Sequence, residues 1–286
     1  YSKKAKEKIV HSEKVNVIIP ADDTISIELP EIAIKDGYDY YVNFSGEQSW
    51  NQYPLGDCTI AQVATTDKKA KVEFEVNAES GIIEKYKVNG VDYIADGFGL
   101  RPNYWRAPID NDYGNGAPAR WQAWKVYGKE CKPAEVTDQM VGENRVVKVV
   151  YNLEDLGCSN VVTYTIEPSG ILTVEAQMSE ASFKEAPRYG VRWRMPQEFA
   201  NVRFYGRGPW ENYCDRKDGA QFAIYSCTVD DMYVPYVRPQ ENGHRVDTRW
   251  LEIKNAKGRG LVIHAVETPF EFNALHNSVE DFDAEE

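Results

Sequence analysis

One stretch of the chain, GRGPWENYCDRKDG at residues 206–219, gathers glycine, aromatic, acidic and basic residues into a short segment. Aromatic faces pack against the C–H side of a sugar ring, and carboxylate, amide and guanidinium groups hydrogen-bond its hydroxyls. The same residues could instead supply a catalytic acid, or lock a tight strand-to-loop turn with ion pairs. We favour the locked turn, because Glu211, Asp215 and Arg216 can satisfy one another.

A second stretch with similar chemistry is DDMYVPYVRPQENGHRVDTRW at residues 230–250. Tyrosines, a glutamate, an asparagine, a histidine and arginines crowd around two prolines and a glycine, which also suits a carbohydrate site. The structural alternative is that Glu241 pairs with Arg245 or caps the backbone, and so locks a turn. The structural alternative is favoured here too.

A third stretch, RPNYWRAPIDNDYGNG at residues 101–116, places oxygen-bearing side chains before glycines, as calcium loops do. An EF-hand would need Asp or Asn where Gly114 stands and Glu where Trp121 stands, so the pattern fails. We therefore predict no metal site. The expectation is a long loop in which Arg106 pairs with one of the aspartates.

Other chemistries receive no support from the sequence. The isolated histidines show no H-x-H or H-E-x-x-H spacing, and no serine-hydrolase, P-loop or Rossmann motif is present. His264 lies in an apolar strand and is expected to be a core histidine. The five cysteines are scattered without any C-x-x-C, so they predict neither disulfides nor zinc, and we expect buried small hydrophobes.

Composition limits the partners. A net charge of -12 opposes binding to nucleic acid or to an anionic membrane surface. The longest apolar runs, such as GLVIHAV at 260–266, are far shorter than the roughly 20 residues of a spanning helix. The first residues carry charge, no apolar signal region and no initiator Met, so we interpret the chain as a piece of a longer soluble protein. The compartment, cytoplasmic or periplasmic, stays open.

The elements that must position these stretches are mostly strands, because apolar residues alternate with a period of two. One short helix is expected at 118–128, which begins with Pro118 and ends at Gly128. The predicted strands are KVNVIIP (14–20), TISIELP (24–30), YDYYVNFS (38–45), KVEFEVNA (71–78), RVVKVVYNL (145–153), NVVTYTIEP (160–168), ILTVEAQMS (171–179), YGVRWRM (189–195) and RWLEIKN (249–255).

The pattern divides the chain into two parts at about residues 62–71, where apolar alternation gives way to charge. Residues 1–66 hold about half the strands of a seven-stranded immunoglobulin-like sandwich. Residues 67–286 hold enough strands for one large antiparallel sandwich. Half a sandwich would expose an apolar face and strand edges, so we expect self-association.

Three motifs resemble a known family: WRAPIDND at 105–112, GRGPWENYCDR at 206–216 and DMYVPYVRPQENGHRVDTRW at 231–250. In this order they are similar to the C-terminal region, or small chain, of the bacterial β-galactosidases of glycoside hydrolase family 2. The likeness runs from about residue 70 to the end. Upstream, IELPE at 27–31 and LGDCTIAQVA at 55–64 resemble the end of the immunoglobulin-like domain that precedes this region.

The resemblance implies a galactose-mutarotase-like super-sandwich for residues 67–286, truncated at its C-terminus, after a partial immunoglobulin-like sandwich. It places the catalytic glutamates on a preceding barrel, so no catalytic residue is assigned here. An active-site tryptophan from near the C-terminus is also implied, and the chain has none after Trp250. Mg or Na ions are left to the longer enzyme, with no cofactor in this segment. The implied partners are the barrel and other domains, a second copy in a homo-oligomer, and galactosides.

The leading hypothesis is a fragment of a β-galactosidase that supports the active site and is inactive alone. The alternatives are a carbohydrate-binding module for galactosides and an aldose-epimerase-like activity, with Glu241 and His244 or His264 as acid and base. The candidate sugar contacts are Trp105, Arg106, Asp110, Asn111, Asp112, Arg207, Trp210, Glu211, Asn212, Tyr213, Asp215, Arg216, Tyr236, Glu241, Asn242, His244 and Arg245.

Overall fold

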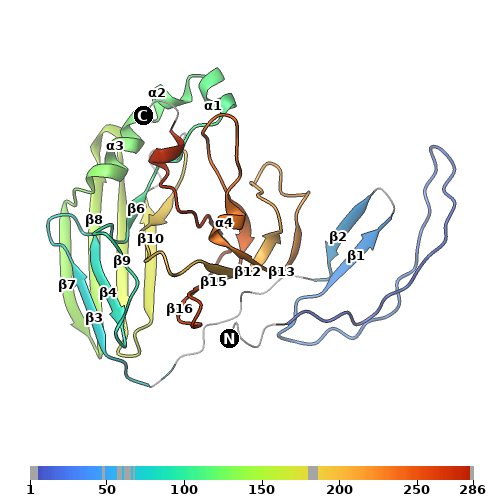
Figure 1. Cartoon of the computed structure of the whole chain (residues 1–286), viewed down its shortest axis with the longest axis horizontal. Helices are drawn as coiled ribbons and strands as arrows, with labels where there is room; N and C mark the ends of the chain where they lie inside the picture. Colours follow the sequence, from blue (N-terminus) through green and yellow to red (C-terminus); the bar gives the residue numbers. More distant parts are fainter. Residues whose placement is uncertain are drawn as a thin grey trace.

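The computed structural model describes residues 6–46, 49–56, 60, 66, 68–179 and 186–283. Antiparallel strands make up most of its regular structure, which confirms the predicted all-β class. Figure 1 shows the strands after residue 70 gathered into one body, with the N-terminal segment extending from its right-hand side. The three candidate stretches all belong to this main body.

One four-stranded sheet runs in the order β10-β9-β8-β7 and is built from successive hairpins. In β9 buried and half-buried residues alternate along the strand, as the period-two pattern requires. A smaller sheet, β3-β4-β5, packs against it around buried Ile83, Val147 and Tyr164. The strand bounds are β3 Val72–Val76, β4 Ile83–Val88, β5 Val91–Asp92, β7 Glu135–Val141, β8 Asn144–Leu153, β9 Cys158–Ile166 and β10 Leu172–Met178.

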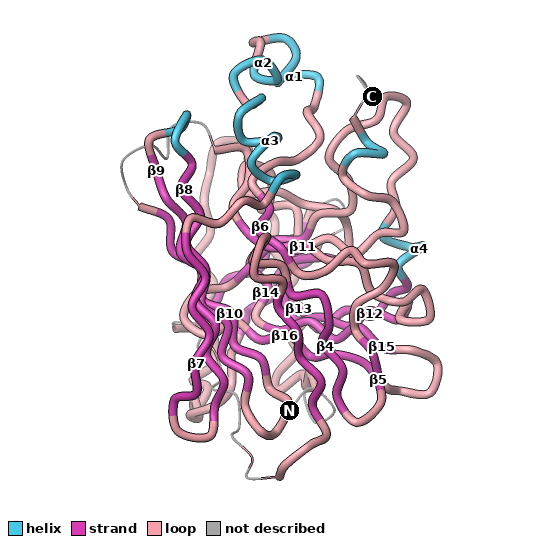
Figure 2. Tube along the Cα trace, turned by 90° about the vertical axis from the view of Figure 1, so that its left-hand side faces the viewer, coloured by secondary structure: helices cyan, strands magenta, loops and turns pink. Residues whose placement is uncertain are grey.

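A second four-stranded sheet runs in the order β13-β12-β15-β16. Its core contains Val202, Phe204 and Leu251, with Phe272 from a neighbouring strand pair. Two short strand pairs, β6 with β11 and β14 with β17, complete the main body, and Figure 2 labels β6, β11 and β14. The bounds are β6 Arg101–Asn103, β11 Gly190–Arg192, β12 Asn201–Gly208, β13 Gln221–Thr228, β14 Arg245–Thr248, β15 Trp250–Lys254, β16 Gly260–His264 and β17 Phe270–Phe272.

The helical segment expected at 118–128 is confirmed, but it is divided at Trp121 into two helices, α2 Ala117–Arg120 and α3 Gln122–Glu130, rather than forming the single helix predicted. They follow α1 Asp110–Gly114, and all three gather at one end of the strands (Figure 2). The remaining short elements are α4 Val229–Met232 and 3-10 turns at Glu154–Leu156 and Glu280–Phe282. No helix within the described ranges has the length and hydropathy to cross a membrane.

The N-terminal segment differs from its prediction. Of the three strands expected before residue 46, one forms: β1 Tyr41–Ser45, which pairs with β2 Trp50–Pro54. The strands predicted at 14–20 and 24–30 are wrong, because these residues are described and contain no strand. Period-two alternation forms a strand only when a partner supplies hydrogen bonds and covers the apolar face. Here the face is open, and Ile18 is 91% exposed.

The N-terminal segment nevertheless contacts the main body along β13, the edge strand of its sheet. The side-chain amide of Gln52 bonds the backbone N–H and carbonyl of Phe222, at 2.6 and 2.9 Å. Tyr41 stacks on the Phe222 ring, and the Tyr205 hydroxyl donates to Asp39 at 2.6 Å. Most of the predicted boundary at 62–71 lies outside the described residues.

The structure confirms the other predicted strands as β3, β8, β9, β10, β11 and β15, for the segments 71–78, 145–153, 160–168, 171–179, 189–195 and 249–255.

The expectation that the cysteines are buried holds in part. Cys131 and Cys158 are buried, whereas Cys214 is exposed on the turn that follows β12, so it is not a core residue. Cys58 lies outside the described residues.

Candidate functional site

The 206–219 stretch is the end of β12 and the turn that leads into β13. Glycine is required at Gly206 because β14 crosses close by: a Cβ there would lie 2.8 Å from Thr248 Oγ1 and 2.9 Å from its Cα. At Gly208 a Cβ would lie 2.8 Å from the Tyr225 ring. These glycines therefore serve close backbone packing.

Glu211 is the central connection between the two loops. Its carboxylate accepts from Arg216 at 2.6 Å, from the backbone N–H of Gly243 at 2.7 Å, and from the Tyr236 hydroxyl. The side chain is 6% exposed. Burial raises the pKa of Tyr236 to about 12, and the hydrogen bond to the Glu211 carboxylate adds to the effect. The expected pairing of Glu211 with Arg216 is thus confirmed, while Asp215 is exposed and stands outside that ion pair.

Asn212 and Arg207 fasten the same turn from within. Asn212 donates to the carbonyls of Arg207 and Trp210, and its Oδ1 accepts from the N–H of Val246. Arg207 donates to Asp247 at 2.8 Å and lies over the Phe222 ring. The polar groups of Asn212 and Arg207 thus form hydrogen bonds and ion pairs within the protein itself. This supports the locked-turn interpretation.

A buried polar cluster occupies the second stretch. Glu241, whose side chain is 2% exposed, accepts from Arg188 at 2.6 Å and from Asn273 at 2.9 Å. His244 Nε2 donates to Glu271 Oε2 at 2.8 Å, and its ring stacks on Tyr213. The hydrogen bond from His244 lowers the pKa of Glu271, whereas burial raises the pKa of Tyr213.

The expected Glu241 and Arg245 pair is wrong. Arg245 donates instead to the carbonyls of Gly243 and His244, each at 3.1 Å, and burial lowers its pKa. Residues four apart face each other on a helix, but this segment is irregular and turns at Gly243, where φ is +67°. Arg245 then begins β14, and its guanidinium caps the carbonyls of the turn that precedes that strand.

The 101–116 stretch is not the long loop that was expected, because it contains β6 and α1, but its expected ion pair is confirmed. Arg106 donates to Asp112 at 2.7 Å, and the same carboxylate oxygen accepts from the Ile109 N–H at 2.8 Å. Trp105 is 5% exposed, with the Lys125 ammonium 4.7 Å from its ring centre. Little of this indole is left open to a ligand.

An open cleft of about 3310 Å³, lined in part by β10, β11, β16 and β17, brings the stretches together. Such a volume is several times that of an ordinary small-molecule pocket. The candidates that line it are Arg106, Asn111, Tyr213, Asp215, Arg216, Tyr236, Glu241, Asn242 and His244. The candidates outside the lining are Trp105, Asp110, Asp112, Arg207, Trp210, Glu211, Asn212 and Arg245. Of these, Asp110 pairs with Arg238 at 3.1 Å and Trp210 is 75% exposed.

Sequence reasoning missed Arg188, Glu271 and Asn273, which complete the buried cluster. They lie outside the three stretches, in segments that carry no motif. Glu271 is in β17, an element without a clear alternation signal. Only the tertiary structure identifies them.

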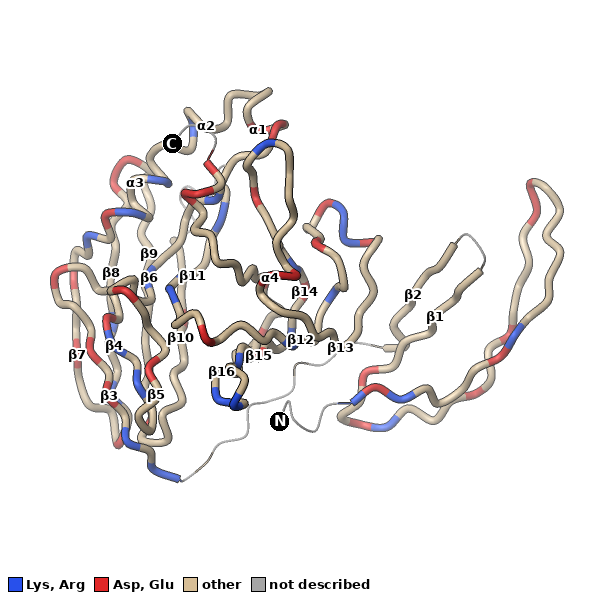
Figure 3. The backbone as a smooth tube through the Cα atoms, viewed as in Figure 1, with Lys and Arg blue, Asp and Glu red and all other residues tan. Residues whose placement is uncertain are grey.

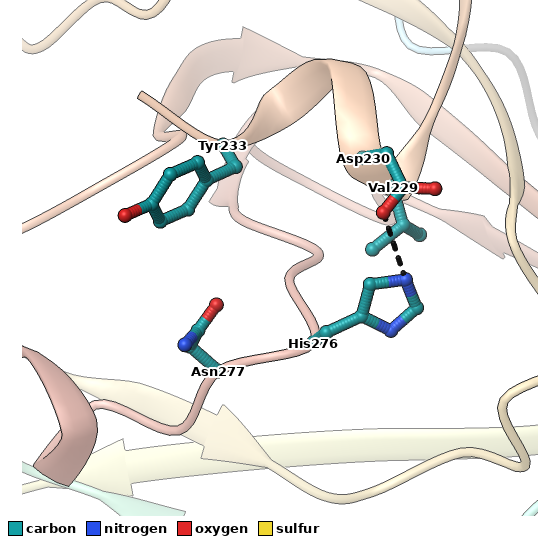
Figure 4. A pocket seen from close by; sticks show the side chains of 5 residues that line it. All are labelled: Val229, Asp230, Tyr233, His276 and Asn277. Carbon is teal, nitrogen blue, oxygen red and sulfur yellow. Dashed lines mark ion pairs between the residues drawn. The ribbon is translucent and has the colours of Figure 1, made fainter. Parts of the chain in front are cut away.

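A smaller hollow of about 220 Å³ lies beside α4 (Figure 4). Tyr233 and Asn277 face it from one side, and His276 with Asp230 from the other. His276 Nε2 and Asp230 Oδ1 are 3.3 Å apart, and their side chains are 42% and 80% exposed.

The carboxylates of the site suit structural roles. A glycosidase needs one carboxyl group with a raised pKa beside a second carboxylate. In the buried cluster, the hydrogen bond from His244 lowers the pKa of Glu271, which is the opposite of what a general acid needs. Among the described residues, no group of three His, Cys, Asp or Glu residues could hold a metal ion.

Comparison of the sequence with known proteins shows the family to which the chain belongs. The family described as "Beta galactosidase small chain" matches residues 68–286. The chain is 37% identical over 200 residues to a β-galactosidase of Priestia megaterium, covering 70% of this chain and 19% of that protein. It is 35% identical over 201 residues to one of Streptococcus thermophilus, covering 69% and 19%. The β-galactosidase BgaC of Bifidobacterium adolescentis is 34% identical over 162 residues, covering 55% and 15%. The chain therefore spans about a fifth of the length of these relatives.

Proposed function

The chain belongs to the β-galactosidase small chain family, and from this we propose that it is the C-terminal part of a longer enzyme that hydrolyses terminal β-galactosides. One observation carries the proposal: the similarity extends over 70% of this chain but only 19% of the Priestia megaterium β-galactosidase. The rest of such an enzyme would supply the catalytic carboxylates.

The role proposed for residues 68–286 is support of an active site formed elsewhere. General acid–base catalysis requires carboxyl groups that are free to exchange protons with the substrate. Glu211 and Glu241, the most buried acids of the candidate stretches, are engaged by arginines, amides and backbone N–H groups. An epimerase-like reaction at Glu241 and His244 is not favoured for the same reason.

The open cleft supports a partner larger than a sugar. Its volume of about 3310 Å³ suits a protein segment, so we propose that other domains of the longer chain pack against it. Where a galactoside is reached at all, the contacts come from the exposed candidates Asn111, Trp210, Asp215 and Arg216. The sandwich is of the galactose-mutarotase-like type in this proposal, and any Mg or Na ion belongs to the longer enzyme.

Residues 1–66 are proposed to complete an immunoglobulin-like domain with preceding parts of the longer protein. Two segments, 14–20 and 24–30, carry strand alternation without strand partners, and their apolar side chains are exposed. Partner strands from the remainder of that domain would cover this face.

A chimeric enzyme tests the proposal. The homologous C-terminal region of the Priestia megaterium β-galactosidase is replaced by residues 68–286, and hydrolysis of nitrophenyl β-galactoside is measured. We expect turnover by the chimera, and none by the truncated relative or by this chain alone. Turnover by the purified chain that disappears in Glu241→Gln would overturn the proposal.

A further inference from the structure

Two arginines face each other directly across a short strand pair. In the register of β6 with β11, Arg101 is the partner of Arg192. Like charges opposite each other on neighbouring strands are destabilising. Arg194, two residues beyond Arg192, adds a third cation to the same neighbourhood, because side chains two apart in an extended segment share a face.

All three guanidinium groups converge on the ring of Phe98. Their Cζ atoms lie 4.0 Å (Arg101), 5.3 Å (Arg192) and 5.6 Å (Arg194) from its centre. Each distance is within the range of a cation–π contact. The Phe98 carbonyl also accepts from the backbone N–H of Arg194 at 3.0 Å, which holds the two backbone segments side by side.

The carboxylates nearby are too few to neutralise the three arginines. Arg192 pairs with Glu280 at 2.8 Å, and Arg194 pairs with Asp96 at 3.4 Å. The Asp96 side chain is 70% exposed, so water screens it. Among the described residues no carboxylate lies within ion-pair distance of Arg101, whose Nε donates to the Gly99 carbonyl at 3.1 Å. Three cations thus share two carboxylates.

The excess charge is local. Phe98, Arg192, Arg194 and Asp96 line the open cleft, whereas Arg101, the strand partner of Arg192, is partly buried beside them and is not part of that lining. The chain as a whole carries a net charge of -12, and Figure 3 shows acidic and basic positions mixed along the trace. Composition therefore does not account for three arginines around one ring.

We propose that Arg192 and Arg194, at the wall of the cleft, form with the neighbouring Arg101 a binding site for an oxyanion, a carboxylate or a phosphate. Guanidinium groups present paired N–H donors that match the two oxygens of such groups. A bound oxyanion neutralises the facing arginines and offsets their repulsion across β6 and β11.

The test titrates the full chain with sodium phosphate and with citrate, at ionic strength held constant with sodium chloride, and follows heat and melting temperature. We expect saturable binding that weakens about tenfold or more in Arg101→Gln and in Arg194→Gln, since one charged hydrogen bond is worth that much. Arg101→Lys keeps the positive charge but loses the paired N–H donors of the guanidinium group. This variant should therefore retain part of the affinity.

Arg238→Gln is the matched control. Arg238 also lies over an aromatic ring, that of Tyr113 at 4.2 Å, and also pairs with one exposed aspartate, so its loss should leave the affinity unchanged. Equal weakening in the control, or no saturable binding by the parent chain, would refute the site. Because Arg194 is half exposed, Arg194→Gln should keep the near-UV circular dichroism of the folded chain.

A last experiment distinguishes two sources of the oxyanion: a free anion from solution, and a carboxylate side chain from a neighbouring domain. A free anion should bind both the isolated chain and the chimera, whereas a carboxylate side chain from a neighbouring domain should block phosphate only in the chimera. Either result supports the site, and binding that survives the combined loss of Arg101 and Arg194 refutes it.

Discussion

At the scale of single residues, the described site is held by buried acids that accept several donors at once. Glu211 receives hydrogen bonds from both loops that meet there, and Glu241 from two segments outside them. Removing such an acceptor leaves each donor unsatisfied in a place where water cannot replace it. The cost of a substitution should therefore follow the number of donors and the burial.

Glu211→Ala should lower the free energy of unfolding by about 3 kcal/mol, because the Gly243 N–H and the Tyr236 hydroxyl lose their acceptor. Urea denaturation followed by tryptophan fluorescence measures the change. Asp215→Asn, four residues along and exposed, should stay within about 0.5 kcal/mol of the parent. Equal losses of unfolding free energy in the two variants would contradict the role of Glu211 in holding the turn.

Glu271 predicts a pH dependence. Its pKa is lowered from 4.5 by the hydrogen bond from His244, so the folded state binds its proton more weakly than the unfolded state. This contribution to stability is present above the unfolded pKa and is lost as the pH falls through the folded pKa.

Glu271→Gln should therefore remove part of the decline in stability below about pH 4.5 and leave the rest of the profile unchanged. Unfolding in urea at a series of pH values, for the parent and the variant, provides the measurement. A variant profile parallel to the parent's in that acid range would rule out the linkage.

At the scale of elements, the close crossing of β12 and β14 positions the first stretch against the second. Gly206→Ala would place a Cβ 2.8 Å from Thr248 Oγ1 and should cost about 1–3 kcal/mol through overpacking. Thermal or urea unfolding reports the loss. Gly219→Ala is the control, since no heavy atom lies within 4 Å of that Cβ, and its stability should be close to the parent's. A neutral Gly206→Ala would show that the two strands can separate freely.

At the scale of the whole molecule, the chain exposes an apolar N-terminal segment beside a well-packed body. Ile9, Ile18 and Ile34 are 82%, 91% and 60% exposed. Apolar surface of this kind favours association. Residues 1–286 should therefore self-associate at micromolar concentration, while residues 68–286 should associate less. Light scattering after size exclusion compares them, and a monomer at every concentration of the longer form would contradict the prediction.

The sequence determined the features that depend on local pattern. Period-two alternation predicted the all-β class and most of the long strands, because burial on one face of a sheet selects every second residue. The sequence also predicted that Arg106 pairs with an aspartate of its own stretch, which is Asp112, six residues away. The predicted set of Glu211, Asp215 and Arg216 is confirmed for Glu211 and Arg216, five residues apart. Neighbours within one loop can meet without help from the rest of the fold.

The tertiary structure decided which distant residues share a site. Glu241 binds Arg188, 53 residues away, rather than nearby Arg245, because the backbone turns at Gly243 and β14 carries Arg245 elsewhere. Strand register, which no local pattern specifies, placed Arg101 opposite Arg192 and brought Glu271 to His244. The same physics explains the failure at residues 14–30: alternation states which face a strand would bury, but hydrogen bonds from a partner strand decide whether it forms.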